Sequence, residues 1–512
     1  MSRKTCYITT PLYYASGNLH IGHLYTTTLA WVISNYKKLN NYEVILLTGS
    51  DEHGQKIQQK AKEANLTPQE FTDKVSQTFM QLWKAYGMDA DFQTWRTSNK
   101  KHVQTVQKAF SYFVNKGLIY KSKYEGLYSI SDEEFLTKSQ ANLGEDGNYY
   151  HPSSGHKLEF VSEESYFFKI SAFKEWISEY IEQHPNFLAP EKTINEIKNS
   201  FLDNLLDLSV TRTNIEWGIP VKEDPTHTIY VWLDALLSYI IALGFDFDDS
   251  SETFQKFWNE GDEIIQLLGK EIARFHFIYW PIFLKSLDLR LPSKIQSHGW
   301  IITPTGKMSK SKGNTIDPYQ LLENYHPEMI KYFFASQIPL GDDGVFEAER
   351  LKNTINADLI NNYGNLVSRT LKMISNSFDR PLVYKKSLND LDIEIENKIL
   401  ESKDQFISYF DKLDLANGFA SAIKLSSSLN KYIDETKPWT LKENLDDLEQ
   451  ILVRLLNGIY AVSTYLSVVM PDKMKEVSQA LNIDFSINYL ENFAKFDNIK
   501  TAKTFMFFER IK

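Results

Sequence analysis

The chain has 512 residues, of which 42% are hydrophobic and 24% are charged, so it can bury several cores and divide into roughly two to four domains. Its formal net charge of −10 argues against a protein that coats nucleic acid through bulk electrostatics, so any RNA recognition must depend on local patches. The single cysteine, Cys6, excludes an intramolecular disulfide and a cysteine metal cluster.

The N-terminal segment lacks the apolar stretch of a secretory signal. No run of about 18 apolar residues that could cross a membrane occurs in the chain. We therefore expect a cytoplasmic protein with no membrane association.

The first part of the chain alternates strand and helix patterns. Cys6–Thr10 is a short β-branched run, and an apolar-periodic stretch predicts a helix from about Ile21 to Leu39. The compact apolar run Glu43–Thr48 is typical of a buried parallel strand. Strand, loop, helix and strand in this order predict a doubly wound α/β sheet.

The segment from about Gly117 to Arg212 differs in character and is interpreted as an insertion. It is rich in Ser, Glu, Gly and Tyr, and its helical periodicity is weak before Ser171–Gln183. The α/β pattern resumes at Thr228–Leu243, where a strand runs into a helix. Further elements are expected in chain order as a strand at Ile264–Leu268, a helix at Ile272–Leu287 and a strand at Lys294–Ser297.

After about Ala348 the chain is predicted to be nearly all helix. Apolar residues recur there at spacings of three and four along two segments, which indicates the core-facing stripes of a helix bundle. The stripes are Leu415, Phe419, Ala422, Leu425, Leu429 and Tyr432, and then Leu448, Leu452, Leu455, Ile459, Val462, Leu466 and Val469.

The segment His20–His23 (His-Ile-Gly-His) follows a predicted strand and turn and opens the first predicted helix. Gly22 at a helix N-terminus allows a phosphate to approach backbone N–H groups closely. The two imidazoles at i and i+3 face the same side of the first turn and could donate hydrogen bonds to phosphate oxygens. On these residues alone, two solvated histidines on a loop remain an alternative.

A second candidate segment contains three lysines within six residues, Lys307, Lys310 and Lys312, between Gly306 and Gly313. A cationic loop with small residues and flanking glycines can close over a polyphosphate. A solvated charge run remains the alternative for this segment taken alone.

Together, His20–His23 and Lys307–Ser311 (Lys-Met-Ser-Lys-Ser) resemble the two signatures of the class I aminoacyl-tRNA synthetases in order, position and strand-to-helix context. Other segments narrow the resemblance to the methionyl-tRNA synthetase family, along almost the whole chain. These segments are Ile8–His23, Thr48–Gly54, Tyr124–Phe135, Tyr230–Tyr239, Leu267–His276, His298–Ile301, Asn365–Arg369 and Lys437–Trp439. The chain has no room for the large editing insertion of the isoleucine, valine and leucine enzymes.

The resemblance implies an α/β Rossmann-like doubly wound parallel sheet with an inserted connective domain, followed by an all-α helix-bundle anticodon-binding domain. The expected parts are a first catalytic half at 1–116, the insertion with a zinc-less knuckle at 117–213, a second catalytic half at 214–320, a stem-contact linker at 321–352, and the helical domain and tail at 353–512. No appended oligonucleotide-binding domain is expected, which favours a monomer.

The implied activity is that of a methionine–tRNA ligase. L-Methionine and ATP, with Mg²⁺, would give methionyl-adenylate, and the methionine would then pass to the 3′-terminal adenosine of tRNA(Met), including the initiator tRNA. The resemblance assigns catalysis to His20, His23, Lys307 and Lys310, and ATP binding to the same four residues with Gly22 and Glu271. For Glu271, a simple first-turn charge is the alternative.

A methionine pocket should be aromatic, with contacts to sulfur and one carboxylate for the ammonium group. Family positions map to Leu12, Tyr14, Asp51, Trp232, Ala235, Tyr239, Phe275 and His276. Asp51 would pair with the ammonium group, while Trp232 and Phe275 would line the side chain. Tyr239 and His276 would supply polar contacts near the sulfur. Taken singly, either of the aromatic residues could be an ordinary core residue.

Many relatives carry a zinc knuckle built from cysteine pairs in the insertion. Here the first two ligand positions hold Ser129 and Asp132, and the second half falls near His151–His156. Because zinc sites of this kind depend on thiolates, we expect no structural zinc and a knuckle held by packing and hydrogen bonds.

In the helical half, the resemblance assigns anticodon binding to Asn365, Arg369, Pro438 and Trp439. An unstacked base can stack on an exposed tryptophan while Asn and Arg contact base edges. A half-buried anchor is the alternative for Trp439. Two other functions are possible: a cysteine enzyme of the same class, and a catalytically idle tRNA-binding descendant. The first would normally need zinc ligands, and the intact His and Lys signatures argue against the second.

Overall fold

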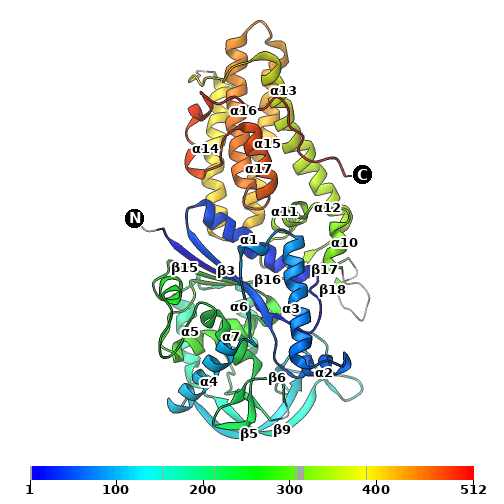
Figure 1. Ribbon diagram of the computed structural model, residues 1–512, viewed down its shortest axis with the longest axis vertical. Helices are drawn as coiled ribbons and strands as arrows, with labels where there is room; N and C mark the ends of the chain where they lie inside the picture. Colours follow the sequence, from blue (N-terminus) through cyan, green and yellow to red (C-terminus); the bar gives the residue numbers. More distant parts are fainter. Residues whose placement is uncertain are drawn as a thin grey trace. The chain divides into compact units, whose positions relative to one another are not determined.

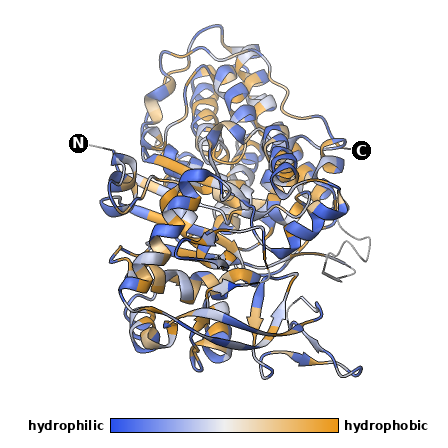
Figure 2. Ribbon diagram, turned by 60° about the horizontal axis from the view of Figure 1, so that its bottom comes forward, coloured by the Kyte–Doolittle hydropathy of each residue, from blue (hydrophilic) through white to orange (hydrophobic). Residues whose placement is uncertain are grey.

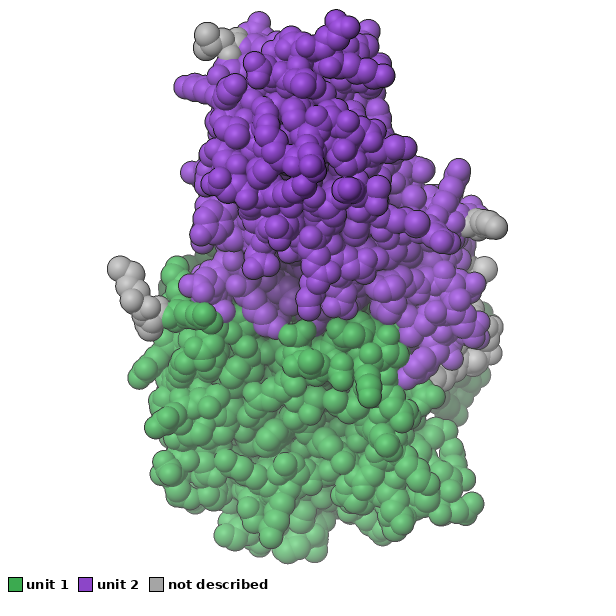
Figure 3. Space-filling view, turned by 45° about the horizontal axis from the view of Figure 1, so that its top comes forward, with its two compact units in different colours: residues 1–30, 43–298 green, residues 31–42, 299–512 purple. Residues whose placement is uncertain are grey.

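The computed structural model describes residues 3–152, 154–213, 215–304, 306–307, 316–387 and 389–511. The chain divides into two compact units, coloured separately in Figure 3. Unit 1 comprises residues 1–30 and 43–298, and unit 2 comprises residues 31–42 and 299–512.

Unit 1 is built on a seven-stranded sheet with the order β10-β16-β15-β1-β3-β2, in which β4 also pairs with β3 (Figure 1). All of its pairs are parallel. The strands are β1 (Thr5–Thr9), β2 (Tyr13–Tyr14), β3 (Glu43–Asp51), β4 (Phe92–Arg96), β10 (Leu188–Ala189), β15 (Glu263–Gly269) and β16 (Lys294–His298). The predicted doubly wound parallel sheet is confirmed, and β3 extends three residues beyond the predicted strand to end at Asp51.

Helices cover this sheet. They are α1 (Ile21–Leu39), α2 (Gln55–Glu63), α3 (Pro68–Ala85), α4 (Lys100–Asn115), α5 (Lys174–Gln183), α6 (Glu191–Ile197), α7 (Val231–Ile241), α8 (Glu252–Phe254) and α9 (Trp280–Ser286). The helix expected over Ile272–Leu287 is interrupted: a π-helical turn at Phe275–Tyr279 precedes α9. Pro281, which has no N–H to donate, lies in the first turn of α9, directly after this change of hydrogen bonding.

The predicted insertion is mainly antiparallel sheet. A four-stranded sheet has the order β11-β9-β5-β6, and its two long strands, β5 and β9, pair over ten residues. The strands are β5 (Ile119–Ser129), β6 (Glu134–Leu136), β9 (Glu159–Phe168) and β11 (Leu208–Ser209), with a separate hairpin of β7 (Asn142–Leu143) and β8 (Tyr149–Tyr150). A three-stranded sheet of β12 (Thr211–Arg212), β14 (Asp224–Ile229) and β13 (Pro220–Val221) leads into α7.

Unit 2 is mainly a helix bundle. Its helices are α10 (Pro318–Leu322), α11 (Pro327–Gln337), α12 (Ala348–Thr354), α13 (Asn365–Ser377), α14 (Asp390–Asp411), α15 (Leu415–Thr436), α16 (Leu445–Leu466) and α17 (Pro471–Leu481). A small sheet has the order β18 (Gly306–Lys307), β17 (Ile301–Thr303) and β19 (Gly344–Val345). Hydrophobic and hydrophilic residues alternate along the helical ribbons, as amphipathic helices require (Figure 2).

Every residue of the two predicted apolar stripes is buried, so the helix-bundle prediction is confirmed. The two stripe-bearing helices approach closely at Gly458, where a Cβ atom would meet Leu429 Cδ2 at 2.3 Å. None of the helices within the described ranges combines the length and apolar character needed to span a bilayer.

Candidate active site

The candidate residues of unit 1 gather at the carboxyl edge of the parallel sheet. His20 and His23 come after β1, Asp51 is the last residue of β3, and Phe275 follows β15. Strand β1 pairs with β3 on one side and with β15 on the other. The next long strand of the chain therefore lies on one side of β1, and the later strands β10, β15 and β16 lie on the other. Ligands of open α/β sheets bind in the crevice at such a switch point.

The two histidines lie against each other at the N-terminus of α1, with ring centroids 4.1 Å apart. The Nδ1 atom of His20 accepts a hydrogen bond from the backbone N–H of Gly22 at 3.0 Å, and that of His23 accepts from the N–H of His20 at 3.1 Å. Because both Nδ1 atoms act as acceptors, each neutral ring carries its proton on Nε2. Nε2 is therefore the nitrogen of each ring that could donate to a phosphate oxygen.

A residue outside the predicted set holds this helix end in place. The hydroxyl of Thr26 lies 2.7 Å from His298 Nε2, and it also lies 3.1 Å from the carbonyl oxygen of Gly22. His298 is the last residue of β16, so the end of one strand is tied to the first turn of α1. The segment His298–Ile301 is one of those that carry the family resemblance, and it was the sequence signal for this position.

Asp51 is a buried carboxylate at the centre of the group. Strand β2 places Tyr14 directly opposite Asp51. Burial raises the pKa of the Asp51 carboxyl well above its usual range, and the nearby charges of Asp234 and Glu133 raise it further. Its neighbour Glu52 is paired with Arg96 at 2.7 Å, whereas Asp51 forms no ion pair with any described residue. A cation bound beside Asp51 would stabilise its ionised form.

Asp234, which the sequence did not single out, bridges two buried histidines near Asp51. Its Oδ2 lies 2.7 Å from His53 Nδ1, and its Oδ1 lies 2.5 Å from His102 Nε2. The indole N–H of Trp95 donates to His102 Nδ1 at 3.2 Å, so His102 donates its Nε2 proton to Asp234. Burial opposes ionisation of Asp234, but His53 and His102 outweigh it and lower its pKa.

The predicted aromatic residues form one continuous wall. The rings of Trp232 and Phe275 are stacked with centroids 3.8 Å apart and planes at 6°. The indole Nε1 of Trp232 is buried and has no acceptor within the described ranges. A buried donor of this kind is costly unless a ligand or water accepts from it, so Trp232 Nε1 can donate a hydrogen bond to a bound group. Ala235 lies one helical turn along α7 and is partly exposed.

Tyr239 and His276 form a neutral hydrogen-bond chain beside this wall. His276 donates from Nδ1 to the carbonyl of Ile272 at 3.0 Å, so its Nε2 accepts from the Tyr239 hydroxyl at 2.8 Å. Burial lowers the pKa of His276 to about 4. The pair is therefore uncharged at neutral pH and can contact a thioether without placing a charge beside it.

The insertion reaches into the site through Glu133. Its carboxylate accepts hydrogen bonds from the hydroxyls of Tyr14, at 3.1 Å, and Tyr128, and from the backbone N–H of Lys56 at 3.3 Å. At Gly54, with φ 121°, a Cβ atom would lie 2.5 Å from the Tyr14 hydroxyl. Glu133 thus holds Tyr14 in place. Leu12, two residues earlier, is 9% exposed.

The knuckle positions in the insertion are joined by hydrogen bonds. The carboxylate of Asp132 accepts from Ser129 Oγ at 2.5 Å and Ser154 Oγ at 2.7 Å, and it lies 3.0 Å from His156 Nδ1. Nearby, His151 Nε2 lies 2.9 Å from Glu134 Oε2. Hydroxyl groups and one carboxylate do not match the thiolate donors of a structural zinc knuckle. Within the described residues, no three His, Cys, Asp or Glu side chains are grouped to hold a metal ion.

The remaining phosphate-binding candidates are placed only in part. Glu271 lies in a 3₁₀ turn, Lys270–Ile272, directly after β15, where it is exposed. Lys307 is in strand β18, opposite Ile302 of β17. Lys310 lies outside the described residues.

In unit 2, Asn365 and Arg369 lie one turn apart near the start of α13. Arg369 Nη2 lies 3.9 Å from Asp434 Oδ1, near the end of α15. After that end, Pro438 is buried, whereas Trp439 is 49% exposed and presents ring surface to solvent. The four predicted anticodon residues thus lie on two helix ends joined by a polar contact.

Comparisons with known proteins identify the family of the chain. Residues 6–145 and 147–371 match the family described as tRNA synthetases class I (M). The chain is 48% identical to the methionine–tRNA ligase of Mycoplasmopsis pulmonis over 100% of both chains, and 42% identical to that of Ureaplasma parvum over 97% of this chain and 96% of the relative. The chain belongs to the methionyl-tRNA synthetase family.

Solved structures of methionyl-tRNA synthetases share the fold. A structure of the Mycobacterium tuberculosis enzyme in complex with methionyl-adenylate has a TM-score of 0.90 and 30% identity, covering 98% of both chains. Its apo form has a TM-score of 0.85 and 28% identity, covering 100% of this chain and 99% of that one. As a member of the methionyl-tRNA synthetases, the chain is a ligase, and the cysteine-enzyme alternative is excluded.

Proposed function

We propose that this chain activates L-methionine with ATP and joins it to tRNA(Met), the initiator tRNA included. The observation that carries the proposal is Asp51, a buried carboxylate that forms no ion pair with any described residue. The same site contains the stacked rings of Trp232 and Phe275, and the neutral hydrogen-bonded pair of Tyr239 and His276. An amino acid with an ammonium group and a long apolar side chain complements all three features.

In the first step, a carboxylate oxygen of methionine attacks the α-phosphorus of ATP, and the bond to the β-phosphate oxygen breaks to release pyrophosphate. His20 and His23 stabilise charge on the transferring group through their Nε2–H donors, and Lys307 and Lys310 bind the polyphosphate. Gly22 leaves room near the adenine, and Glu271 contacts the ribose. Mg²⁺ bound to ATP would neutralise part of the phosphate charge.

Around methionine, Asp51 pairs with the ammonium group. Trp232 and Phe275 line the side chain, with Leu12, Tyr14 and Ala235 completing the pocket. Tyr239 and His276 contact the thioether end. In the second step, a hydroxyl of the terminal adenosine attacks the carbonyl carbon of the adenylate, and AMP leaves.

The test of this function is methionine-dependent exchange of radiolabelled pyrophosphate into ATP by the purified full chain. Exchange should require methionine, and cysteine should not replace it. Absence of exchange with all amino acids would leave only a tRNA-binding protein.

Anticodon recognition by Trp439 gives a prediction that separates the two reactions. A base stacked on an aromatic ring contributes roughly 1–3 kcal/mol, so Trp439→Ala should weaken tRNA charging about ten- to a hundredfold. Pyrophosphate exchange should be nearly unchanged, because adenylate chemistry does not involve the anticodon. Both assays are run on one preparation, with Tyr489→Ala as a control that removes another exposed ring of unit 2.

A parallel fall in exchange and charging would make Trp439 a structural anchor. No change in either reaction would place anticodon recognition elsewhere.

The knuckle gives a second prediction. Because Asp132 is surrounded by hydroxyl donors and the chain has one cysteine, the purified enzyme should contain no stoichiometric zinc. Chelators should not inactivate it beyond removing Mg²⁺. Elemental analysis is the measurement, and one tightly bound zinc ion per chain would contradict the prediction.

A further inference from the structure

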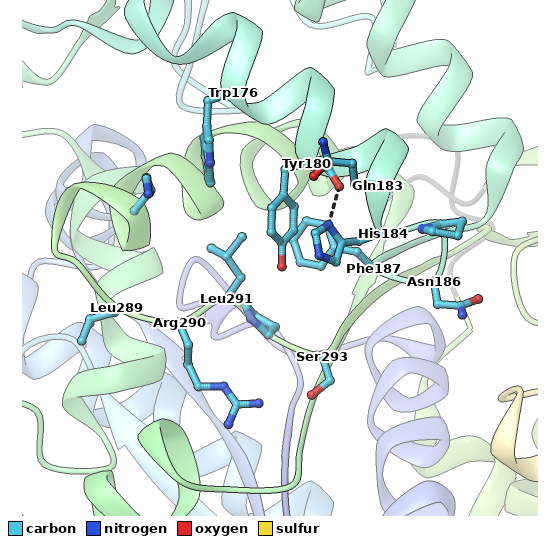
Figure 4. A pocket seen from close by; sticks show the side chains of 13 residues that line it. Trp176, Tyr180, Gln183, His184, Asn186, Phe187, Leu289, Arg290, Leu291 and Ser293 are labelled. Atoms are coloured by element: carbon cyan, nitrogen blue, oxygen red, sulfur yellow. Dashed lines mark hydrogen bonds between the residues drawn. The ribbon is translucent and has the colours of Figure 1, made fainter.

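Unit 1 has an open groove with a volume of about 710 Å³ outside the candidate active site (Figure 4). One wall comes from α5 and the residues that follow it, and the other from the end of α9 and the segment leading into β16. We call it the α5 groove, defined by Trp176, Tyr180, His184, Lys285, Arg290 and Leu291.

The α5 groove lies at the amino edge of the sheet. Its residues Gln183–Phe187 directly precede β10, and Leu289–Ser293 directly precede β16. These two strands are parallel, so both begin at the same edge. The active-site residues follow the carboxyl ends, and a strand of five residues such as β16 spans about 16 Å. The groove is therefore separate from the site of adenylate formation.

Three rings form a ladder along the α5 wall. The ring centroids of Trp176 and Tyr180 are 5.7 Å apart, and those of Tyr180 and His184 are 4.0 Å apart with planes at 19°. The Nδ1–H of His184 donates to the carbonyl of Tyr180 at 2.9 Å, which holds the imidazole parallel to the phenol ring. Trp176 and Tyr180 are half-buried and His184 is exposed, so ring surface remains accessible in the groove.

Two cationic side chains, Lys285 and Arg290, line the groove together with this ladder. Lys285 Nζ lies 5.6 Å from the centroid of the Trp176 ring. Arg290 Nη1 donates to the carbonyl of Gly261 at 2.6 Å, which anchors the guanidinium group. Neither cation forms an ion pair with a residue in the described part of the chain. Burial lowers the pKa of Arg290, and the nearby Tyr180 and Asp262 only partly oppose this shift.

The charge of the groove is opposite to that of the chain. None of its lining residues is Asp or Glu, although the chain has 66 acidic and 56 basic residues. Two acidic residues outside the groove lining, Asp262 and Asp288, interact electrostatically with these cations, and each also has another partner. Asp262 accepts from the backbone N–H of Thr5 at 2.8 Å, and Asp288 pairs with Lys116 at 2.7 Å.

We propose that the α5 groove is a second nucleotide site, which takes a nucleoside diphosphate with its base against the Trp176–Tyr180–His184 ladder and its phosphates between Lys285 and Arg290. Any nucleotide base can stack on aromatic rings, and cations that form no ion pair within the described residues complement phosphate. The groove volume is in the range of small-ligand sites, roughly 300–1,000 Å³. The polar side chains of Gln183, Asn186 and Ser293 can contact the ribose.

A small nucleotide fits this location better than the end of a tRNA. The 3′ end of a charged tRNA must reach the carboxyl edge, where the adenylate forms, and the α5 groove is at the other edge. An RNA segment crossing the groove is the outcome that the test must separate from a bound nucleotide.

The experiment is equilibrium dialysis of radiolabelled ADP with the full chain, its catalytic site saturated with a non-hydrolysable sulfamoyl analogue of methionyl-adenylate. One ADP should bind per chain. Lys285→Glu and Trp176→Ala should each weaken binding at least tenfold. Lys101→Glu, at an exposed position near the start of α4, is the matched control and should bind as the wild type does. Lys285→Gln is a milder second variant, and thermal unfolding and pyrophosphate exchange verify that each variant is folded.

Competition experiments identify which parts of the nucleotide the α5 groove binds. ADP should compete at least tenfold better than pyrophosphate or adenosine, because the groove binds both parts. The proposal is overturned if no ADP binds with the catalytic site filled, or if the Lys285 variants bind like the wild type. It is also overturned if pyrophosphate competes as well as ADP, which means an adventitious anion only. If a short single-stranded RNA displaces radiolabelled ADP at a lower concentration of nucleotides than unlabelled ADP does, the proposal is overturned and the groove is an RNA contact.

Discussion

Replacing Asp51 with Asn should raise the KM for methionine in pyrophosphate exchange roughly a hundred- to several-thousand-fold, since removing one partner of a buried ion pair costs about 3–5 kcal/mol. The KM for ATP should stay within about twofold, because the ammonium contact involves methionine only. Asp51→Ala should show the same loss.

The fold should survive this change and gain stability. Burial raises the pKa of Asp51, which means that the folded protein disfavours the ionised carboxylate at neutral pH. Asp51→Asn removes this buried charge, so the unfolding temperature without methionine should stay equal or rise. A variant that unfolds earlier and also loses activity would identify Asp51 as a structural residue instead.

The same pKa shift sets a pH dependence. As the pH falls through the raised pKa of Asp51, the carboxylate of the free enzyme becomes protonated and can no longer pair with the ammonium group. The wild-type KM for methionine should therefore rise on acidification at a higher pH than an ordinary aspartate would cause. Asp51→Asn should lack this rise, and a wild-type KM that is flat over this range would contradict the pairing.

Replacing Lys310 with Ala should lower kcat for exchange by about 30- to 1,000-fold, the effect of removing about 2–4 kcal/mol of stabilisation from the transferring phosphoryl group. The affinity for ATP in the ground state should change much less, since a contact that strengthens mainly in the transition state contributes more to kcat than to substrate binding. Single-turnover kinetics separate the two quantities.

The matched control for this variant is Lys312→Ala, which removes the same charge from the same segment. A smaller effect there would show that position, and not charge alone, determines the loss at Lys310. If Lys310→Ala instead raises the KM for ATP with kcat unchanged, the segment is a simple binding element.

Sequence patterns correctly predicted the elements whose formation depends on local sequence alone. The apolar period predicted α1 from Ile21 to Leu39, the residues at which it begins and ends. The stripes from Leu415 and from Leu448 predicted buried faces, because burial of an amphipathic helix depends on its own sequence period. The helix over Ile272–Leu287 was the exception: the apolar pattern continues through it, whereas the backbone hydrogen bonding changes from π-helical to α-helical near Pro281.

The parts of the candidate site that escaped prediction depend on contacts between distant segments. Asp234 lies 181 residues from His53 and 132 from His102, and no short pattern connects these three residues. Glu133 lies 119 residues from Tyr14 and belongs to a segment interpreted only as a degenerate knuckle. The run of three acids, Asp132 to Glu134, was the available signal, because a buried acid needs hydrogen-bond donors from elsewhere in the chain.

The contact between Glu133 and Tyr14 also bears on how this enzyme can be re-engineered. An insertion that supplies a hydrogen-bond acceptor to Tyr14, which we propose contacts methionine, cannot be exchanged independently of the rest of unit 1. A chimera carrying another family member's insertion, without an acid at this position, would fold and still have a displaced Tyr14 hydroxyl. Its defect would appear as poor amino-acid selection, so grafted insertions must be chosen together with the residues around Gly54.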